Sequence, residues 1–176
     1  MTRILVAFAT RNGSTEEVAG TIAATLRDGG CAVELRRAAE LRDPLEGCDL
    51  LILGAPLYSG RWHRDAHRLL RRHRDQLGRI PVAVFGMGPR TGDEEGWRAS
   101  RGQLDRALAK RAWLAPVAVA VFGGVDPPKR RRTERRDLRD WDAIRAWAGG
   151  LPDLARHAAD PGIHPPGEAE GAGEQG

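Results

Sequence analysis

The sequence is poor in cysteine, lysine and aromatic residues. Its 176 residues include two Cys, one Tyr, three Phe and five Trp, and the lysines are Lys110 and Lys129. Cys31 and Cys48 are too few for a disulfide framework, and no histidine lies beside them at the spacing of zinc ligands. We therefore expect two reduced, buried cysteines and no metal site.

The chain also lacks a long apolar run. No stretch reaches the roughly 20 apolar residues of a membrane span. The longest uncharged apolar stretch, residues 113–125, holds a proline and two glycines. Residues 1–3 lead straight into an apolar run without a cleavage site of small residues. These absences predict a cytoplasmic protein that contacts the inner face of a membrane at most peripherally.

Five short apolar runs alternate with four segments of helical periodicity. The runs span residues 4–9, 32–35, 50–54, 82–85 and 117–122, and the helical segments span residues 14–27, 62–77, 97–111 and 141–158. Because the runs are almost continuously apolar, we expect an α/β fold whose parallel sheet is covered on both faces. We place one domain at residues 1–158. Residues 159–176 are rich in Pro, Gly and acid without Lys or Arg, which predicts a disordered tail.

The turn after the first predicted strand has the composition of a phosphate-binding loop. It places hydroxyl and amide side chains around a glycine at the start of a helix, where unpaired N–H groups and the helix dipole favour an anion. The residues are Thr10, Arg11, Asn12, Gly13, Ser14 and Thr15. The alternative is that Ser14 or Thr15, with Glu17, only caps the helix. The glycine signatures of dinucleotide and Walker sites are absent, and a phospho-acceptor domain would need acids where Thr10 and Ala55 stand.

Two further loops at the same predicted sheet edge suit a planar aromatic ligand. The loop after the third strand is apolar and aromatic, and it contains Pro56, Leu57, Tyr58, Ser59, Gly60 and Trp62. Tyr58 or Trp62 would stack on such a ligand, whereas the alternative is that Trp62 anchors the next helix in the core. The loop after the fourth strand contains Gly86, Met87, Gly88 and Pro89, where backbone N–H groups could approach a ligand edge closely.

These loops carry a family resemblance. T-x-N-G-x-T at residues 10–15 resembles the flavodoxin phosphate loop. G-A-P-L-Y-S-G-R-W at 54–62, P-V-A-V-F-G-M-G-P at 81–89 and R-D-W-D-A-I-R-A-W-A at 139–148 are similar to the flavodoxin-domain proteins of the menaquinone-dependent protoporphyrinogen oxidase family. The resemblance covers about residues 1–158. It implies a flavodoxin-like three-layer sandwich with a five-stranded parallel sheet in the order 2-1-3-4-5.

The resemblance also implies the cofactor and the chemistry. Residues 10–15 would hold the phosphate of FMN, residues 56–60 and Trp62 would flank its isoalloxazine ring, and residues 86–89 would line the other edge. No catalytic side chain is expected, because the flavin carries the redox chemistry. The implied function is an FMN-dependent oxidoreductase of haem biosynthesis that passes electrons from a porphyrinogen to a quinone. The alternatives are a flavodoxin-type electron carrier to a protein partner and a flavin-free interaction domain.

Arginine-rich segments flank the predicted site. Residues 61–79 hold seven Arg against Asp65 and Asp75, and residues 127–139 hold seven Lys or Arg against Glu134 and Asp137. Such a rim would attract an acidic partner, an acidic substrate or anionic lipid headgroups, and the alternative is a solvated arginine surface. We do not expect nucleic-acid binding, because no aromatic residues are interleaved with the arginines. His63 and His67 lack further ligands at metal spacing, so we expect solvated side chains.

Overall fold

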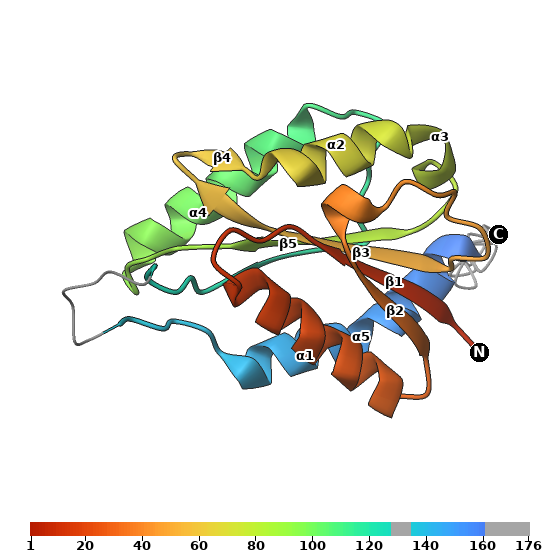
Figure 1. Ribbon diagram of the computed structural model, residues 1–176, viewed down its shortest axis with the longest axis horizontal. Coiled ribbons are helices and arrows are strands. Elements are labelled where there is room, and N and C mark those ends of the chain that lie inside the picture. The colour runs from red at the N-terminus through yellow and green to blue at the C-terminus, as the bar shows by residue number, and fades with distance from the viewer. Residues whose placement is uncertain (128–134, 161–176) are drawn as a thin grey trace, which may run out of the picture.

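A computed structural model describes residues 1–127 and 135–160 of the chain as a sheet between two layers of helices (Figure 1). The strands are β1 (Arg3–Phe8), β2 (Ala32–Arg37), β3 (Leu50–Tyr58), β4 (Arg61–Trp62), β5 (Val82–Met87) and β6 (Ala118–Phe122). The helices are α1 (Ser14–Asp28), the 3-10 turn η1 (Ala38–Glu40), α2 (Arg64–Arg72), α3 (Arg74–Leu77), α4 (Glu94–Ala109) and α5 (Trp141–Ala159). Apart from residues 159 and 160, the predicted acidic tail lies outside the described residues.

The sheet has the predicted topology. Its parallel strands follow the order β2-β1-β3-β5-β6, and this confirms the expected order 2-1-3-4-5 because the short β4 lies off that path. β4 pairs antiparallel with the end of β3, with Leu57 opposite Trp62. Ser59 and Gly60 form the intervening turn with φ values of 47° and 75°. Two positive φ angles are typical of tight hairpin turns that match the strand twist. Residues 56–62 are therefore a β-hairpin and not the loop that the sequence pattern predicts.

The two faces of the sheet bury separate apolar clusters. Helices α1 and α5 cover one face, where Ile22, Leu26 and Ile144 are fully buried. Helices α2, α3 and α4 cover the other face, where Leu70 and Leu104 are fully buried (Figure 1). Both faces of the central strands are thus removed from water, which accounts for their continuous apolar sequence.

The segment predicted as one helix over residues 62–77 is divided. Trp62 belongs to β4, and α2 begins after His63, whose Nδ1 accepts a hydrogen bond from the Asp65 N–H at 3.1 Å. His73 separates α2 from α3. Its ring is 4% exposed, and its Nε2 lies 3.1 Å from the Leu41 carbonyl oxygen. The buried polar ring of His73, bonded to the neighbouring chain segment, thus lies where the helix is interrupted.

The cysteines are unpaired but less buried than expected. Both Cys31 and Cys48 are half-exposed free thiols. The Cys48 Sγ lies 3.2 Å from the Leu50 carbonyl oxygen, and burial raises the pKa of this thiol.

Gly54 gives a test of the packing at the carboxyl ends of the strands. A Cβ at this position would lie 1.8 Å from Cζ of Phe85, a fully buried ring. We expect Gly54→Ala to lower the free energy of unfolding in urea by about 1–3 kcal/mol or more, because the aromatic ring cannot move aside. The control is Gly20→Ala inside α1, where no atom lies within 4 Å of the added Cβ. It should stabilise the protein by about 0.5–1 kcal/mol. Equal stability of the two variants would contradict this packing.

Candidate functional site

The carboxyl ends of three neighbouring strands meet at one edge of the sheet. Phe8 at the end of β1 lies opposite Gly54 in β3, and Gly54 lies opposite Phe85 in β5. The segments that follow these residues form the walls of a groove. Its lining residues are Arg11, Asn12, Ser14, Thr15, Pro56, Leu57, Tyr58, Met87, Gly88, Arg90, Gly124 and Val125. The structure therefore brings together residues from all three segments that the sequence predicts to form the site.

The turn before α1 leaves the start of this helix open. Gly13 adopts a left-handed conformation with φ of 89°, and its N–H donates to Thr10 Oγ1 at 2.8 Å. No side chain makes a capping hydrogen bond at this terminus. The first N–H groups of a helix have no partner inside the helix. The capping alternative for Ser14 and Thr15 is therefore wrong, and the helix terminus remains able to bind an anion.

Thr15 has a buried hydroxyl that points to an acceptor at this terminus. The residue is 1% exposed, and its hydroxyl is the only buried side-chain polar atom without a hydrogen-bond partner in the described part of the chain. Leaving a hydroxyl buried and unpaired costs about 1–3 kcal/mol. A phosphate at the helix N-terminus would accept this hydrogen bond together with those of the open N–H groups. The donors present therefore fit the phosphate of FMN.

Tyr58 supplies the aromatic wall of the groove. It lies at the end of β3 in the β3–β4 hairpin, and its hydroxyl accepts a hydrogen bond from Asn12 Nδ2 at 3.1 Å. Two guanidinium groups lie over its ring. Cζ of Arg11 is 4.8 Å from the ring centroid, and Cζ of Arg90 is 5.6 Å from it. The tyrosine thus joins the phosphate-loop side of the groove to the segment after β5.

Trp62 does not reach the groove. It is 2% exposed, and its Nε1 donates to the Ala55 carbonyl oxygen at 3.2 Å. Its ring meets His67 edge-on at a centroid distance of 5.7 Å. The prediction that Trp62 flanks the ligand ring is corrected by this burial, and the alternative of a core anchor holds. Of the hairpin residues, Ser59 and Gly60 form the exposed turn and also lie outside the lining.

The segment after β5 contributes less backbone than expected. Gly86 and Met87 belong to the strand itself, and the Gly88 N–H donates to the Phe122 carbonyl oxygen at 2.9 Å. Pro89 has no N–H. The expected role of Gly88 as a free backbone donor is therefore corrected. Met87 and Gly88 still line the groove, whereas Gly86 and Pro89 do not.

Three lining residues were missed by the sequence patterns. Arg90 directly follows the predicted segment 86–89, and Gly124 and Val125 follow β6. The signal for the last two was available, because the carboxyl end of β6 reaches the same sheet edge and is followed by two glycines. Arg90 belongs to no sequence motif, and it reaches the groove because it follows the end of β5.

A salt bridge network ties the connection between β6 and α5 to α1. Val125 and Asp137 form an isolated antiparallel β-bridge through their backbones, and the Leu138 N–H donates to the Gly124 carbonyl oxygen. Arg139, whose side chain is 9% exposed, pairs with both Asp137 and Glu17. The hydrogen bonds from Arg139 lower the pKa of Asp137. The described part of this connection is thereby fixed beside the start of α1, and its residues Gly124 and Val125 line the groove.

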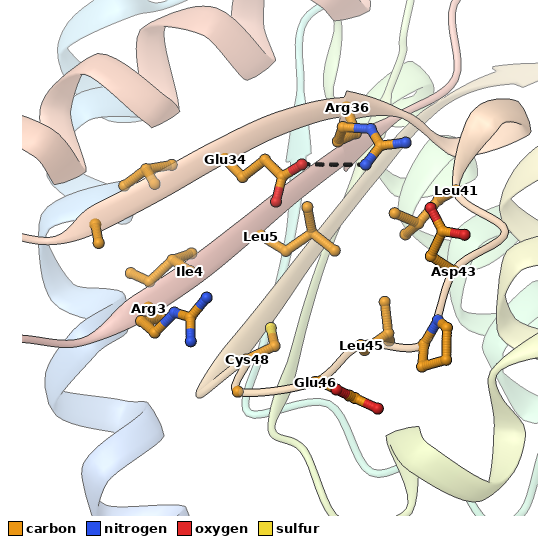
Figure 2. Close-up of a pocket in the computed structure, with 14 residues that line it drawn as sticks. Arg3, Ile4, Leu5, Glu34, Arg36, Leu41, Asp43, Leu45, Glu46 and Cys48 are labelled. Atoms are coloured by element: carbon orange, nitrogen blue, oxygen red, sulfur yellow. Dashed lines mark hydrogen bonds and ion pairs between the residues drawn. The ribbon is translucent and has the colours of Figure 1, made fainter.

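A second hollow lies away from these segments. It is bounded by β1, β2 and residues 41–48, and Figure 2 shows the ion pair of Glu34 and Arg36 on its β2 side. Its volume is about 310 Å³. Arg3, the first residue of β1, and Cys48, two residues before β3, also line it. None of the segments predicted to bind a ligand contributes to this hollow, so the groove at the carboxyl ends is the candidate site.

His63 and His67 have structural partners instead of the predicted solvated side chains. His63 caps α2 as described above. His67 Nδ1 lies 2.9 Å from Arg111 Nη1, and Arg111 Nη2 donates to the His67 carbonyl oxygen. Burial and the charges of Arg111 and Lys110 lower the pKa of His67 to about 4. In the described residues, no group of three or more His, Cys, Asp or Glu side chains is placed to hold a metal ion.

Comparisons with known proteins agree with this fold. The flavodoxin domain family matches residues 5–144. The protoporphyrinogen IX dehydrogenase [quinone] of Escherichia coli strain K12 is 26% identical over 156 residues, which cover 88% of this chain and 84% of that protein. Among solved structures, a short-chain flavodoxin associated with a PDU bacterial microcompartment matches with a TM-score of 0.61 and 20% identity, covering 88% of this chain and 99% of that one. Oxidised flavodoxin 1 from Bacillus cereus matches with a TM-score of 0.58 and 21% identity, covering 89% and 99%.

Thr15→Val tests the unpaired hydroxyl. Because the substitution removes a buried hydroxyl without a partner, we expect the ligand-free protein to become more stable by about 1 kcal/mol or more in urea unfolding, while its affinity for FMN falls. The control is Thr25→Val in the same helix. The Thr25 hydroxyl donates to the Thr21 carbonyl oxygen at 2.9 Å, so this variant should lose stability and keep its affinity. A Thr15→Val variant with lower stability and unchanged affinity would argue against an anion site here.

His67 predicts a pH dependence of stability. Its pKa in the folded protein is about 4, below the value of about 6.5 in an unfolded chain. As the pH falls through this window, the unfolded state takes up a proton that the folded state does not, so this contribution to stability is lost. Urea unfolding at about pH 7 and about pH 4.5 should show a smaller loss in His67→Gln than in the parent. An equal loss in both proteins would mean that His67 does not titrate as described.

Proposed function

The chain belongs to the flavodoxin-domain family, whose cofactor is FMN, and from this premise we propose that it oxidises a porphyrinogen and passes the electrons to a quinone. The family and the fold make this chain an FMN flavodoxin-like oxidoreductase. The finer proposal is supported by the name of the E. coli relative, a protoporphyrinogen IX dehydrogenase [quinone]. The observation that supports a flavin in this chain is the groove, whose lining includes Thr15 with its buried, unpaired hydroxyl.

The residues at the start of α1 would hold the phosphate of FMN. The left-handed Gly13 turns the backbone so that the first N–H groups of α1 face the anion together, and the helix dipole adds to their attraction. Ser14 and Thr15 would add hydroxyl donors, and Thr10, whose Oγ1 already accepts from Gly13, keeps the turn closed. The uncapped helix end and the buried hydroxyl support this assignment.

The opposite walls of the groove would hold the flavin ring. Tyr58 would pack against one face, and the apolar side chains of Leu57 and Met87 would exclude water from the ring. When bound, FMN supplies the redox chemistry by accepting and releasing electrons, so no acid or base among the side chains is required. The chain's own contribution is to bind and orient the ring and to leave one edge of the groove open to a substrate.

We further propose that the exposed arginines of α2 and α3 contact an anionic partner or lipid headgroups. Arg64 and Arg68 lie near Asp65, whereas Arg71, Arg72 and Arg74 are exposed without an acidic partner in the described residues. Arg71, Arg72 and Arg74 lie at the end of α2 that is remote from the β3–β4 hairpin, so they would hold a partner or lipid headgroups at α3 and not at the groove itself. No helix in the described ranges is long and apolar enough to cross a membrane.

The function is tested with the FMN-loaded protein, protoporphyrinogen IX and menaquinone. We expect porphyrin fluorescence to appear with quinone present and to remain at background without it. The control is a Tyr58→Ala variant, which removes the aromatic wall and should lower the rate about tenfold or more through a displaced ring. Protein whose FMN, once reduced with dithionite, passes its electrons to a redox protein, but which turns over no porphyrinogen, would exclude the oxidase and establish the electron carrier.

A further inference from the structure

Two arginine side chains lie over the ring of Tyr58 in the groove. Arg11 belongs to the turn after β1 and Arg90 to the segment after β5, and both guanidinium groups lie over the Tyr58 ring at 4.8 Å and 5.6 Å from its centroid. They are the charged side chains of the described groove lining, which contains no carboxylate. The walls of the groove are therefore electropositive.

The neighbouring acids do not cancel this charge. Glu16 pairs with Arg37, and Glu17 and Asp137 pair with Arg139. Asp93 caps α4 by accepting the Gly96 N–H at 2.7 Å. In the part of the chain that the structure describes, neither Arg11 nor Arg90 forms an ion pair. Both cations are thus available to act on a bound group.

We propose that Arg11 and Arg90 set the redox preference of the site by favouring the anionic, reduced form of FMN. This inference rests on the proposed function. The oxidised isoalloxazine is neutral, and taking up two electrons and one proton leaves one negative charge on the ring. A positive charge held near the ring lowers the free energy of the reduced form by Coulomb attraction and leaves that of the oxidised form almost unchanged. Since both arginines are exposed, the effect is weakened by salt.

This positive charge would favour a flavin that accepts electrons from a substrate. A site that binds reduced FMN more tightly than oxidised FMN has a higher reduction potential, because the two binding steps and the two reductions form a closed cycle. Arg90 acts here as a positioning and charge-setting residue and is not a proton donor. Arg11 has two possible actions, on the phosphate and on the ring. Only the second changes the ratio of the two affinities.

The test compares the dissociation constants of oxidised FMN and of FMN reduced with dithionite. We expect Arg90→Gln and Arg11→Gln each to weaken the reduced form about three- to tenfold more than the oxidised form at low ionic strength. A tenfold change in the ratio corresponds to about 30 mV for a two-electron couple. The double variant should show the larger change, and added salt should reduce the difference between variant and parent.

Two further variants separate charge from structure. Arg90→Lys keeps the charge and should keep most of the parent's affinity ratio. Arg79→Gln removes one exposed arginine near the amino end of β5, at the opposite edge of the sheet, and should leave the ratio unchanged. Equal weakening of both redox forms by Arg90→Gln, or the same ratio change in Arg79→Gln, would overturn the inference and leave the proposed function standing. A parent protein that binds no FMN would overturn both.

Discussion

The parallel register of β1, β3 and β5 is the constraint on which the site depends. Phe8, Gly54 and Phe85 lie side by side across these strands, so the chain leaves all three at one edge of the sheet. This register requires a residue without a side chain at position 54, because the Phe85 ring occupies the space where a Cβ would stand. The same ring packs against Phe122 and Trp147, which couples β6 and α5 to the arrangement. The fold thereby places the phosphate-loop turn, the hairpin and the segment after β5 around one groove.

Within the groove, stability and binding make opposite demands. The uncapped start of α1 and the buried Thr15 hydroxyl both leave donors without acceptors, which disfavours the ligand-free folded state. A bound phosphate would satisfy these donors together, so binding and folding should be coupled. The ion pairs of Arg139 with Glu17 and Asp137 join α1 to the β6–α5 connection and so hold the start of α1 in position. Arg139 also lies over the ring of Trp141, the first residue of α5, with its Cζ 4.7 Å from the ring centroid.

The sequence predicts the fold better than it predicts the walls of the site. Continuous apolar runs identify the central strands because they are buried on both faces. The composition of the turn at residues 10–15 suits both an anion site and a simple helix cap, and the structure decides against the cap. The hairpin at 56–62 was not expected because the positive φ of Ser59 is a backbone property that its residue type rarely shows. Trp62 was placed in the site because an aromatic residue in a glycine-containing segment has the same appearance whether it faces solvent or core. Arg90 comes to the groove through strand register and has no local motif, whereas Gly124 and Val125 follow the end of β6, where two glycines offered a signal that was not used.

The central claim is that the groove binds FMN through its phosphate as well as its ring. The most direct measurement is a titration of the ligand-free protein with FMN and with riboflavin, which has the same ring but no phosphate, followed by quenching of flavin fluorescence. The account predicts saturable binding of FMN and an affinity for riboflavin that is lower by about two orders of magnitude, because several charge-assisted hydrogen bonds are lost. Equal affinity for the two flavins, or no binding of either, would contradict it.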